Sequence, residues 1–167
     1  MKLAKAKLQC LDNEKQSITF MFNPNELGFS RSMSLEQSQG ARTEQGQNKV
    51  SFKHPNPYSL KISNIMLDTY ELGTSVLKQV TPFTTSVQFI EKEERPPIYL
   101  FTWGDNNYLR CFVKSFNFKL TLFLPDGTPV RAVVDLTLEQ VDPPSPSENQ
   151  GTPDPGTGER NDQVFLI

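Results

Sequence analysis

The sequence of 167 residues contains little of what most catalytic and metal-binding proteins require. It has a single histidine, His54, and two cysteines, Cys10 and Cys111. Two cysteines cannot form a disulfide framework or a zinc site by themselves, and both lie among alternating apolar residues, which favours buried free thiols. No apolar run approaches the roughly 18–20 residues of a membrane helix, so we expect no direct membrane insertion. Lysines interrupt the first seven residues, where a signal peptide would carry its apolar segment, so the sequence gives no evidence of export by that route.

An excess of either charge is also missing, because 17 basic residues face 19 acidic ones. The imbalance lies in residues 143–167, where four acidic residues face one arginine, while residues 1–142 carry 16 basic and 15 acidic residues. Phosphate binding needs clustered Lys and Arg. We therefore expect no nucleic-acid partner, and a reduced cytoplasmic environment is the default.

The prolines divide the chain in the same place, since five of the 13 fall between Pro143 and Pro155. This composition is typical of a disordered linker. It predicts one domain over residues 1–142 and an acidic tail over residues 143–167. The tail carries four apolar residues at Val164–Ile167, which either fray or dock on the chain's own domain or a neighbour.

Period-two alternation of apolar and polar residues predicts strands along most of the domain. Residues 3–22 are expected to form a hairpin, and further strands are expected over 29–35, 50–52, 60–67, 98–103, 108–124 and 130–141. The alternation changes phase at Asn64 and again at Lys114-Ser115, which indicates β-bulges. Asp126-Gly127 predicts the turn of a long hairpin from Thr121 to Leu138, because this pair tolerates the positive φ that such turns demand.

Two segments depart from this pattern. Residues 36–49 are rich in Gln, Ser, Gly and Asn, which predicts a mobile loop. Apolar residues after Gly73 recur at helical spacing. Because Thr81-Pro82 suits a helix start, we expect a short helical turn, a break, and a second helix from Pro82 to Ile90. The fold class is therefore mainly β, with one flanking helical segment.

The sequence predicts no catalytic, cofactor-binding or metal site. His54 lies in a rigid His-Pro-Asn-Pro loop, far in sequence from either cysteine, and the glycines are scattered singly. Asp68 and Glu71 offer fewer oxygen ligands than a cation site needs. An aromatic groove on a barrel remains open as an alternative to core packing. It would be formed by Phe101, Trp103, Phe116, Phe118 and Phe123.

Four segments in order resemble contractile injection system tube and baseplate adaptor proteins, which are related to phage tails. The segments are Phe20-Met21-Phe22-Asn23-Pro24-Asn25-Glu26-Leu27, Leu67-Asp68-Thr69-Tyr70-Glu71-Leu72-Gly73-Thr74-Ser75-Val76, Pro96-Pro97-Ile98-Tyr99-Leu100-Phe101-Thr102-Trp103-Gly104 and the hairpin of residues 120–138. In the hairpin, the run Leu124-Pro125-Asp126-Gly127-Thr128-Pro129 carries the resemblance.

The resemblance implies a tail-tube-like antiparallel β-barrel or sandwich with a flanking helix, and a structural subunit rather than an enzyme. It implies rings, expected to be hexameric, between the spike or baseplate and the inner tube, with those components as partners. It also implies assembly in the cytoplasm into a particle that is either released or attached to a membrane. The LysM module of many members is not found in these 167 residues. A monomeric β-barrel that binds a carbohydrate or a peptide is the alternative.

Overall fold

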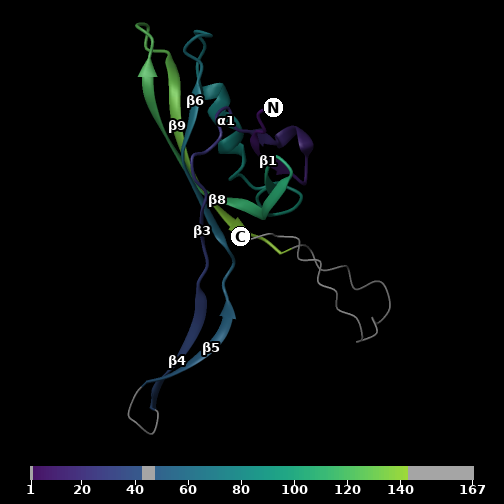
Figure 1. Ribbon diagram of the computed structural model, residues 1–167, viewed down its shortest axis with the longest axis vertical. Coiled ribbons are helices and arrows are strands. Elements are labelled where there is room, and N and C mark those ends of the chain that lie inside the picture. The colour runs from purple at the N-terminus through teal and green to yellow at the C-terminus, as the bar shows by residue number, and fades with distance from the viewer. Residues whose placement is uncertain (1, 43–47, 143–167) are drawn as a thin grey trace, which may run out of the picture.

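The computed structural model describes residues 2–42 and 48–142 of the chain (Figure 1). The predicted tail of residues 143–167 lies outside the described residues. The described elements are β1 (Ala6–Cys10), the 3-10 helix η1 (Glu14–Gln16), β2 (Ile18–Thr19), β3 (Gly28–Ser30), β4 (Met33–Arg42), β5 (Asn48–Pro55), β6 (Ser59–Asp68), α1 (Leu77–Thr85), β7 (Tyr99–Trp103), β8 (Asn106–Phe123) and β9 (Pro129–Gln140). The prediction of a mainly β fold with one flanking helix is confirmed.

Seven of the strands form one antiparallel sheet in the order β2-β1-β7-β8-β9-β6-β3, and it curls into a half-barrel. Strand β8 joins its two halves. The first part of β8 pairs with β7, and from Cys111 onward β8 pairs with β9. A register shift between Val113 and Ser115 marks a bulge where β8 leaves β7. Bulges bend the strand that carries them, and the phase change at Lys114-Ser115 had predicted this one.

The other predicted turns and bulges are also present. Asn64 adopts a left-handed φ of 58° at the register shift in β6, and its N–H donates to an Asp135 carboxylate oxygen at 2.8 Å. Gly127 has φ 86° in the β8–β9 turn, where Asp126 accepts a hydrogen bond of 2.9 Å from the N–H of Thr128. The β1–β2 hairpin is confirmed, with β1 beginning at Ala6.

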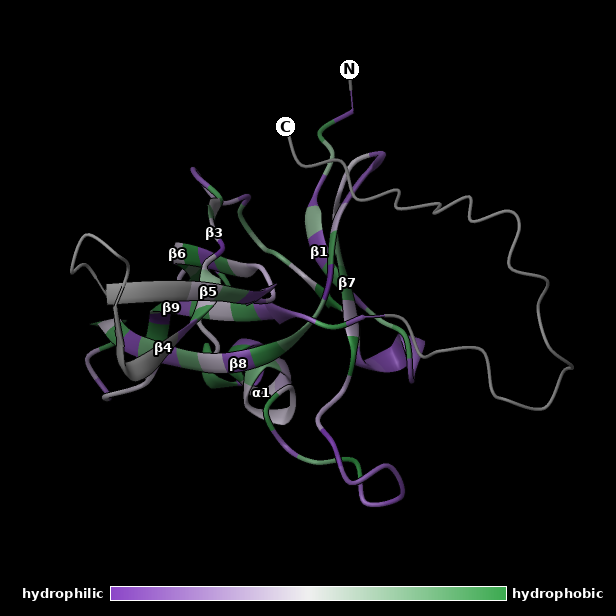
Figure 2. Cartoon of the chain, turned by 90° about the horizontal axis from the view of Figure 1, so that it is seen from below, coloured by the Kyte–Doolittle hydropathy of each residue, from purple (hydrophilic) through white to green (hydrophobic). Residues whose placement is uncertain are grey.

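The hydrophobic core is formed by residues of the sheet and of α1. Figure 2 shows apolar residues alternating with polar ones along the strands. Val80 and Phe83 of α1 are buried against it. Aromatic rings connect the elements across the core. Phe83 lies 6.3 Å from Phe20, Phe20 lies 6.0 Å from Phe101, and Phe101 lies 5.8 Å from Tyr108. The helix is therefore held by side-chain packing against several strands.

The predicted break at Pro82 was wrong, because α1 continues through it as one helix and ends at Thr85. A proline inside a helix removes one hydrogen bond and costs ~3 kcal/mol. Pro82 is flanked by Val80 and Phe83, which are 3% and 1% exposed. Burial of side chains of this size contributes about 1.5–3 kcal/mol each, so packing offsets the cost of the proline.

The predicted mobile loop of residues 36–49 was also wrong in its described part. Residues 36–42 belong to β4 and residues 48–49 to β5, and these two strands form an antiparallel ribbon. The expected strand of residues 29–35 is divided between β3 and β4. A two-stranded ladder is held by backbone hydrogen bonds. Polar residues can therefore form it without the apolar alternation that sequence analysis relies on.

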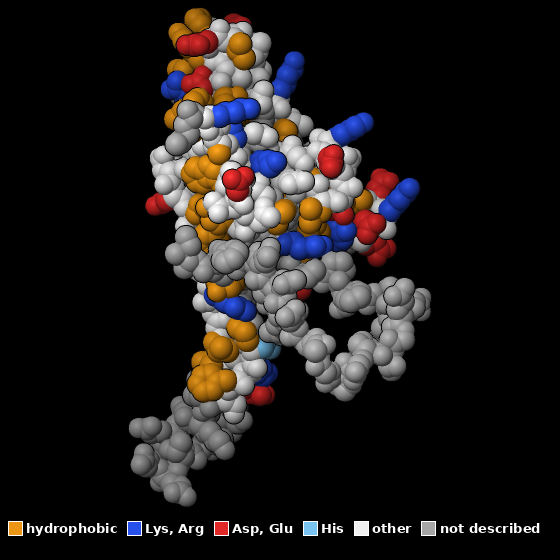
Figure 3. All heavy atoms as spheres, turned by 45° about the vertical axis from the view of Figure 1, so that its right-hand side comes forward, with side chains coloured by type: hydrophobic (Ala, Val, Ile, Leu, Met, Phe, Trp, Pro, Cys, Tyr) orange, Lys and Arg blue, Asp and Glu red, His pale blue; other side chains and the backbone are white. Residues whose placement is uncertain are grey.

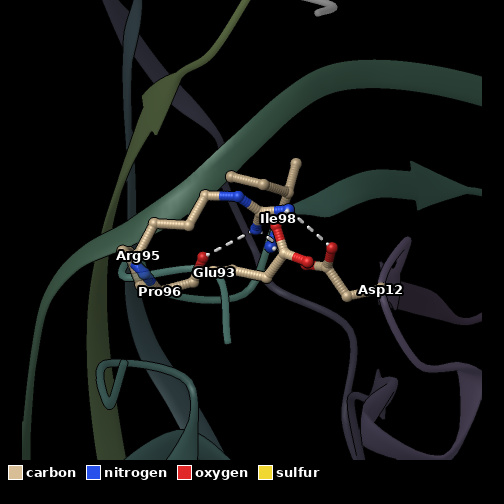
Figure 4. Close-up of polar contacts among 5 residues, drawn as sticks. All are labelled: Asp12, Glu93, Arg95, Pro96 and Ile98. Atoms are coloured by element: carbon tan, nitrogen blue, oxygen red, sulfur yellow. Dashed lines mark hydrogen bonds and ion pairs between the residues drawn. The ribbon is translucent and has the colours of Figure 1, made fainter. Parts of the chain in front are cut away.

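An ion pair joins the turn after β1 to the segment before β7 (Figure 4). Both Asp12 carboxylate oxygens accept from Arg95, at 2.8 and 3.0 Å, and the N–H of Ile98 donates to the same carboxylate at 2.8 Å. Glu93 lies 3.6 Å from the same guanidinium. The Arg95 hydrogen bonds hold the pKa of Asp12 below its ordinary value, with the Ile98 N–H adding to the effect.

Replacing Asp12 with Asn is expected to lower the free energy of unfolding by about 1–2 kcal/mol near neutral pH, because charge-assisted hydrogen bonds to a partly buried carboxylate are lost. A carboxylate with a lowered pKa stabilises the fold above its unfolded pKa, and this contribution is lost as the pH falls through the folded value. The difference between wild type and Asp12→Asn should therefore shrink as the pH falls below 3.8. Urea unfolding across that range measures it.

The control is Asp105→Asn, which makes the same chemical change at an exposed residue in the β7–β8 turn. It should leave stability nearly unchanged. An equal loss in both variants, or a loss at Asp12 that persists at low pH, would contradict the assignment.

Candidate assembly surfaces

The β4–β5 ribbon projects from the body, at the lower end of the molecule in Figure 1. On this ribbon Leu35 pairs directly with Phe52, and Met33 lies two residues before Leu35 on the same strand. Leu35 is 50% exposed and Phe52 is 77% exposed. Figure 3 shows apolar side chains gathered on this part of the molecule. We call Met33, Leu35 and Phe52 the ribbon patch. Contiguous exposed apolar surface of this kind marks an interaction site.

The two strands of the ribbon are joined at its root by Asn56, which lies between β5 and β6. Its N–H donates to the Ser32 carbonyl at 2.8 Å, its side-chain NH₂ donates to the Ser32 hydroxyl at 2.8 Å, and its side-chain oxygen accepts from the Ser34 hydroxyl at 2.6 Å. The Asn56 carbonyl accepts from Arg31 Nε at 2.8 Å. These bonds tie both strands of the ribbon together where they leave the sheet.

Two strands of the sheet are longer than the outer neighbours that pair with them: β8 is longer than β7, and β6 is longer than β3. Strand β7 pairs with β8 only as far as Cys111, and β3 pairs with β6 only at Ser59–Lys61. In the described part of the chain, no strand pairs with the remaining side of β8 over 112–123 or of β6 over 62–68. Such edges present free N–H and C=O groups and are templates for pairing with another chain.

Apolar side chains accompany the β8 edge. The rings of Phe116 and Phe118 are stacked, with centroids 6.2 Å apart and planes 7° apart. Phe118 is 40% exposed, and Phe123, at the end of the same strand, is 53% exposed. Their side of the sheet is the one that elsewhere faces the core, because Phe116 and Phe118 pair with the buried Leu136 and Val134. In a single chain, these core-facing side chains at the β8 edge are therefore left partly exposed.

The candidate residues from the sequence do not converge. His54 is exposed on β5, whereas Cys10 and Cys111 are buried in the body. Burial raises the pKa of the Cys111 thiol to about 12, which disfavours the reactive thiolate. Asp68 accepts hydrogen bonds from Arg131 and from the N–H of Tyr70, while Glu71 is exposed. Across residues 2–42 and 48–142, no group of three or more His, Cys, Asp and Glu side chains is placed to hold a metal ion.

The aromatic residues considered for a groove are spread over the molecule. Phe101 is buried in the core, Trp103 packs against the core, and Phe123 lies at the far end of β8. The five side chains therefore do not line one cleft. No helix in the described ranges is both long and apolar enough to cross a membrane.

Sequence analysis missed the structural roles of two asparagines, one at the root of the ribbon and one at the start of β1. Asn56 has no signal beyond its position between two prolines. Asn23 accepts a hydrogen bond from the N–H of Ala6 at 2.9 Å and donates to the Ala4 carbonyl at 2.8 Å, which anchors the start of β1. Asn23 belongs to the Phe-Asn-Pro segment that carries the resemblance, so this segment has a structural role in the fold.

Comparison with known proteins gives one family match. The family model described as contractile injection system tube protein matches residues 2–149. No curated protein matches the chain significantly.

Replacing Asn56 with Ala is expected to loosen the ribbon without unfolding the body, because the two side-chain hydrogen bonds at its root are lost. Backbone amides of residues 33–36 and 51–54 should exchange with solvent several-fold faster, while those of β8 and β9 stay protected. Hydrogen exchange followed by mass spectrometry measures both regions. Asn107→Ala, at an exposed position in β8, is the control, and unchanged exchange in the Asn56→Ala ribbon would contradict its assigned role.

Proposed function

Because the chain belongs to the contractile injection system tube protein family, and so has a structural role, we propose that it forms a ring that joins the spike or baseplate to the inner tube. The expected ring is a hexamer. Its neighbours would be the inner tube protein, the spike protein and other baseplate components. The two open sheet edges are the observation that supports this proposal most strongly.

The edges are suited to joining copies in a ring. Strand β8 is antiparallel to β9, and β9 is antiparallel to β6, so β8 and β6 run in the same direction. A rotation about an axis along the strands would bring the β8 edge of one copy beside the β6 edge of the next as a parallel pair. Such a contact uses two different surfaces of each copy, and heterologous contacts of this kind close into a ring when the rotation per copy divides a full turn.

The same contact would cover apolar surface that a free subunit exposes. Phe116 and Phe118 lie at the β8 edge and would continue the core into the neighbouring copy. The ribbon patch lies on a separate projection from the body (Figure 3). A ribbon that reaches beyond its own subunit is placed to contact a neighbouring copy or an adjacent layer.

The face of the β6–β9–β8 sheet that is turned away from the core would line the channel of such a ring. On this face, four basic residues (Lys61, Lys114, Lys119 and Arg131) accompany three acidic ones (Asp68, Asp135 and Glu139). Lys114 pairs with Glu139, and Asp68 pairs with Arg131 at 2.6 Å. A wall with a net charge of only +1, on which two of the four basic side chains are paired, has little attraction for a polyanion. This is consistent with our expectation of no nucleic-acid partner.

We further propose that assembly takes place in the cytoplasm, in a particle that is either released or attached to a membrane. Electron microscopy of material purified through a tag after Met1, expressed in the native host, tests the function directly. Sheathed tubular particles with this chain in stoichiometric amount near one end would support the ring. A monomer without particle-sized partners would contradict it and favour a ligand-binding barrel.

The double variant Leu35→Ser, Phe52→Ser is expected to reduce incorporation into particles by about 100-fold or more. Burial of each side chain contributes about 1.5–3 kcal/mol, so the two together contribute at least about 3 kcal/mol, and each 1.4 kcal/mol is a factor of ten. Its melting temperature should stay close to that of wild type, since both side chains are exposed in the free chain. Quantitative mass spectrometry of purified particles measures the incorporation.

The matched control is Phe89→Ser, at a side chain that is 69% exposed but belongs to the segment between α1 and β7, and so to neither the ribbon nor the strands β6 and β8. It should be incorporated normally. Equal incorporation of the ribbon variant and the control would rule out a role for the ribbon patch in assembly.

A further inference from the structure

A polar pocket of about 450 Å³ lies at the root of the ribbon, where β3 meets β4 and β5 meets β6. Its polar lining includes three serine hydroxyls and three charged side chains, namely Ser30, Ser32, Ser59, Arg31, Lys114 and Glu139. Lys114 and Glu139 form an ion pair with each other across the β8–β9 ladder. Arg31 therefore supplies the excess charge, and the pocket carries a net charge of +1.

Arg31 is held in a defined orientation. Its Nε donates to the Asn56 carbonyl at 2.8 Å, and its guanidinium lies 4.6 Å from the centroid of the Tyr58 ring. The Asn56 carbonyl thus occupies one edge of the guanidinium, and the Tyr58 ring covers one of its faces. No carboxylate of the described residues pairs with it. A guanidinium fixed in this way presents its two terminal nitrogens in the geometry that matches a carboxylate.

We propose that the pocket binds a carboxylate of the chain's own acidic segment, residues 143–162. This segment contains Glu148, Asp154, Glu159 and Asp162 against a single Arg160. The chain also leaves the sheet beside the pocket, since β9 ends at Gln140, whose N–H donates to the Tyr58 carbonyl at 2.8 Å. The seven residues from Asp142 to Glu148 span up to about 20 Å between their ends when extended. Arg31 lies within this reach, because it packs on Tyr58, which is hydrogen-bonded to Gln140 two residues before Asp142.

This inference goes beyond the proposed ring and does not depend on it. Binding at this pocket would couple the acidic segment to the Asn56 anchor of the ribbon, because Arg31 contacts both. The segment would therefore influence the part of the molecule that carries the ribbon patch.

The test uses the full chain, dilute and unassembled, with Arg31→Lys. A water-soluble carbodiimide joins a lysine amine to an adjacent carboxylate as an amide, with loss of water, and mass spectrometry identifies the pair. The lysine introduced at position 31 should be joined to Glu148, Asp154, Glu159 or Asp162. This product should fall several-fold at about 1 M salt, where the Debye length is ~3 Å. The unaltered Lys119, outside the pocket, serves as the internal control and should give less of the product.

Two further variants keep the result decisive. Changing the four acidic residues to their amides should abolish the product at position 31. Ser59→Lys, which places an amine on another wall and keeps Arg31, should give links to the same segment. Links from position 31 to Glu139 alone, links to a carboxylate outside residues 143–162, or no link at all would overturn the proposal.

Discussion

Backbone hydrogen bonding along β8 is the constraint on which the rest of the structure depends. This strand has 18 residues, whereas its neighbour β7 has five. One side of β8 is paired by β9 along most of its length, and the other side is paired only at its start. Peptide groups left unpaired in this way are tolerable in water, but they become costly when buried. Pairing this edge with another strand buries it while giving its peptide groups hydrogen-bond partners.

The interactions that hold the subunit together are separate from the surfaces that we assign to assembly. The aromatic rings from Phe83 to Tyr108 and the ion pair of Asp12 and Arg95 lie within the body. The ribbon patch and the outer part of β8 lie outside it, and Asn56 holds the two strands of the ribbon together at its root. Stability and assembly can therefore be changed independently by mutation, which is what a subunit that folds first and assembles later requires.

The sequence allowed the long hairpin and both bulges to be predicted, because each apolar face carries a period of two and each bulge shifts that period by one residue. The ribbon could not be predicted in this way, since residues 36–42 pair through their backbone and lack an apolar alternation. The prediction of a break at Pro82 was wrong because it considered only the energetic cost of a proline within the helix. That cost is offset by the burial of Val80 and Phe83, which depends on packing against strands distant in sequence. Asn56 and Arg31 act through contacts between distant segments, which spacing along the chain does not reveal. The resemblance indicated the family, and the structure added the edges and the pocket.

The bend in β8 connects the subunit's fold to the geometry of its assembly. The bulge at Val113–Ser115 sets the angle between the half of the sheet that contains β7 and the half that contains β9 and β6. If the β8 edge meets the β6 edge of the next copy, the curvature within one subunit is continued from copy to copy. Heterologous contacts close into a ring only when the rotation per copy divides a full turn, and otherwise they extend into filaments. In the proposed ring, a one-residue insertion in β8 would thus specify the curvature of the channel wall.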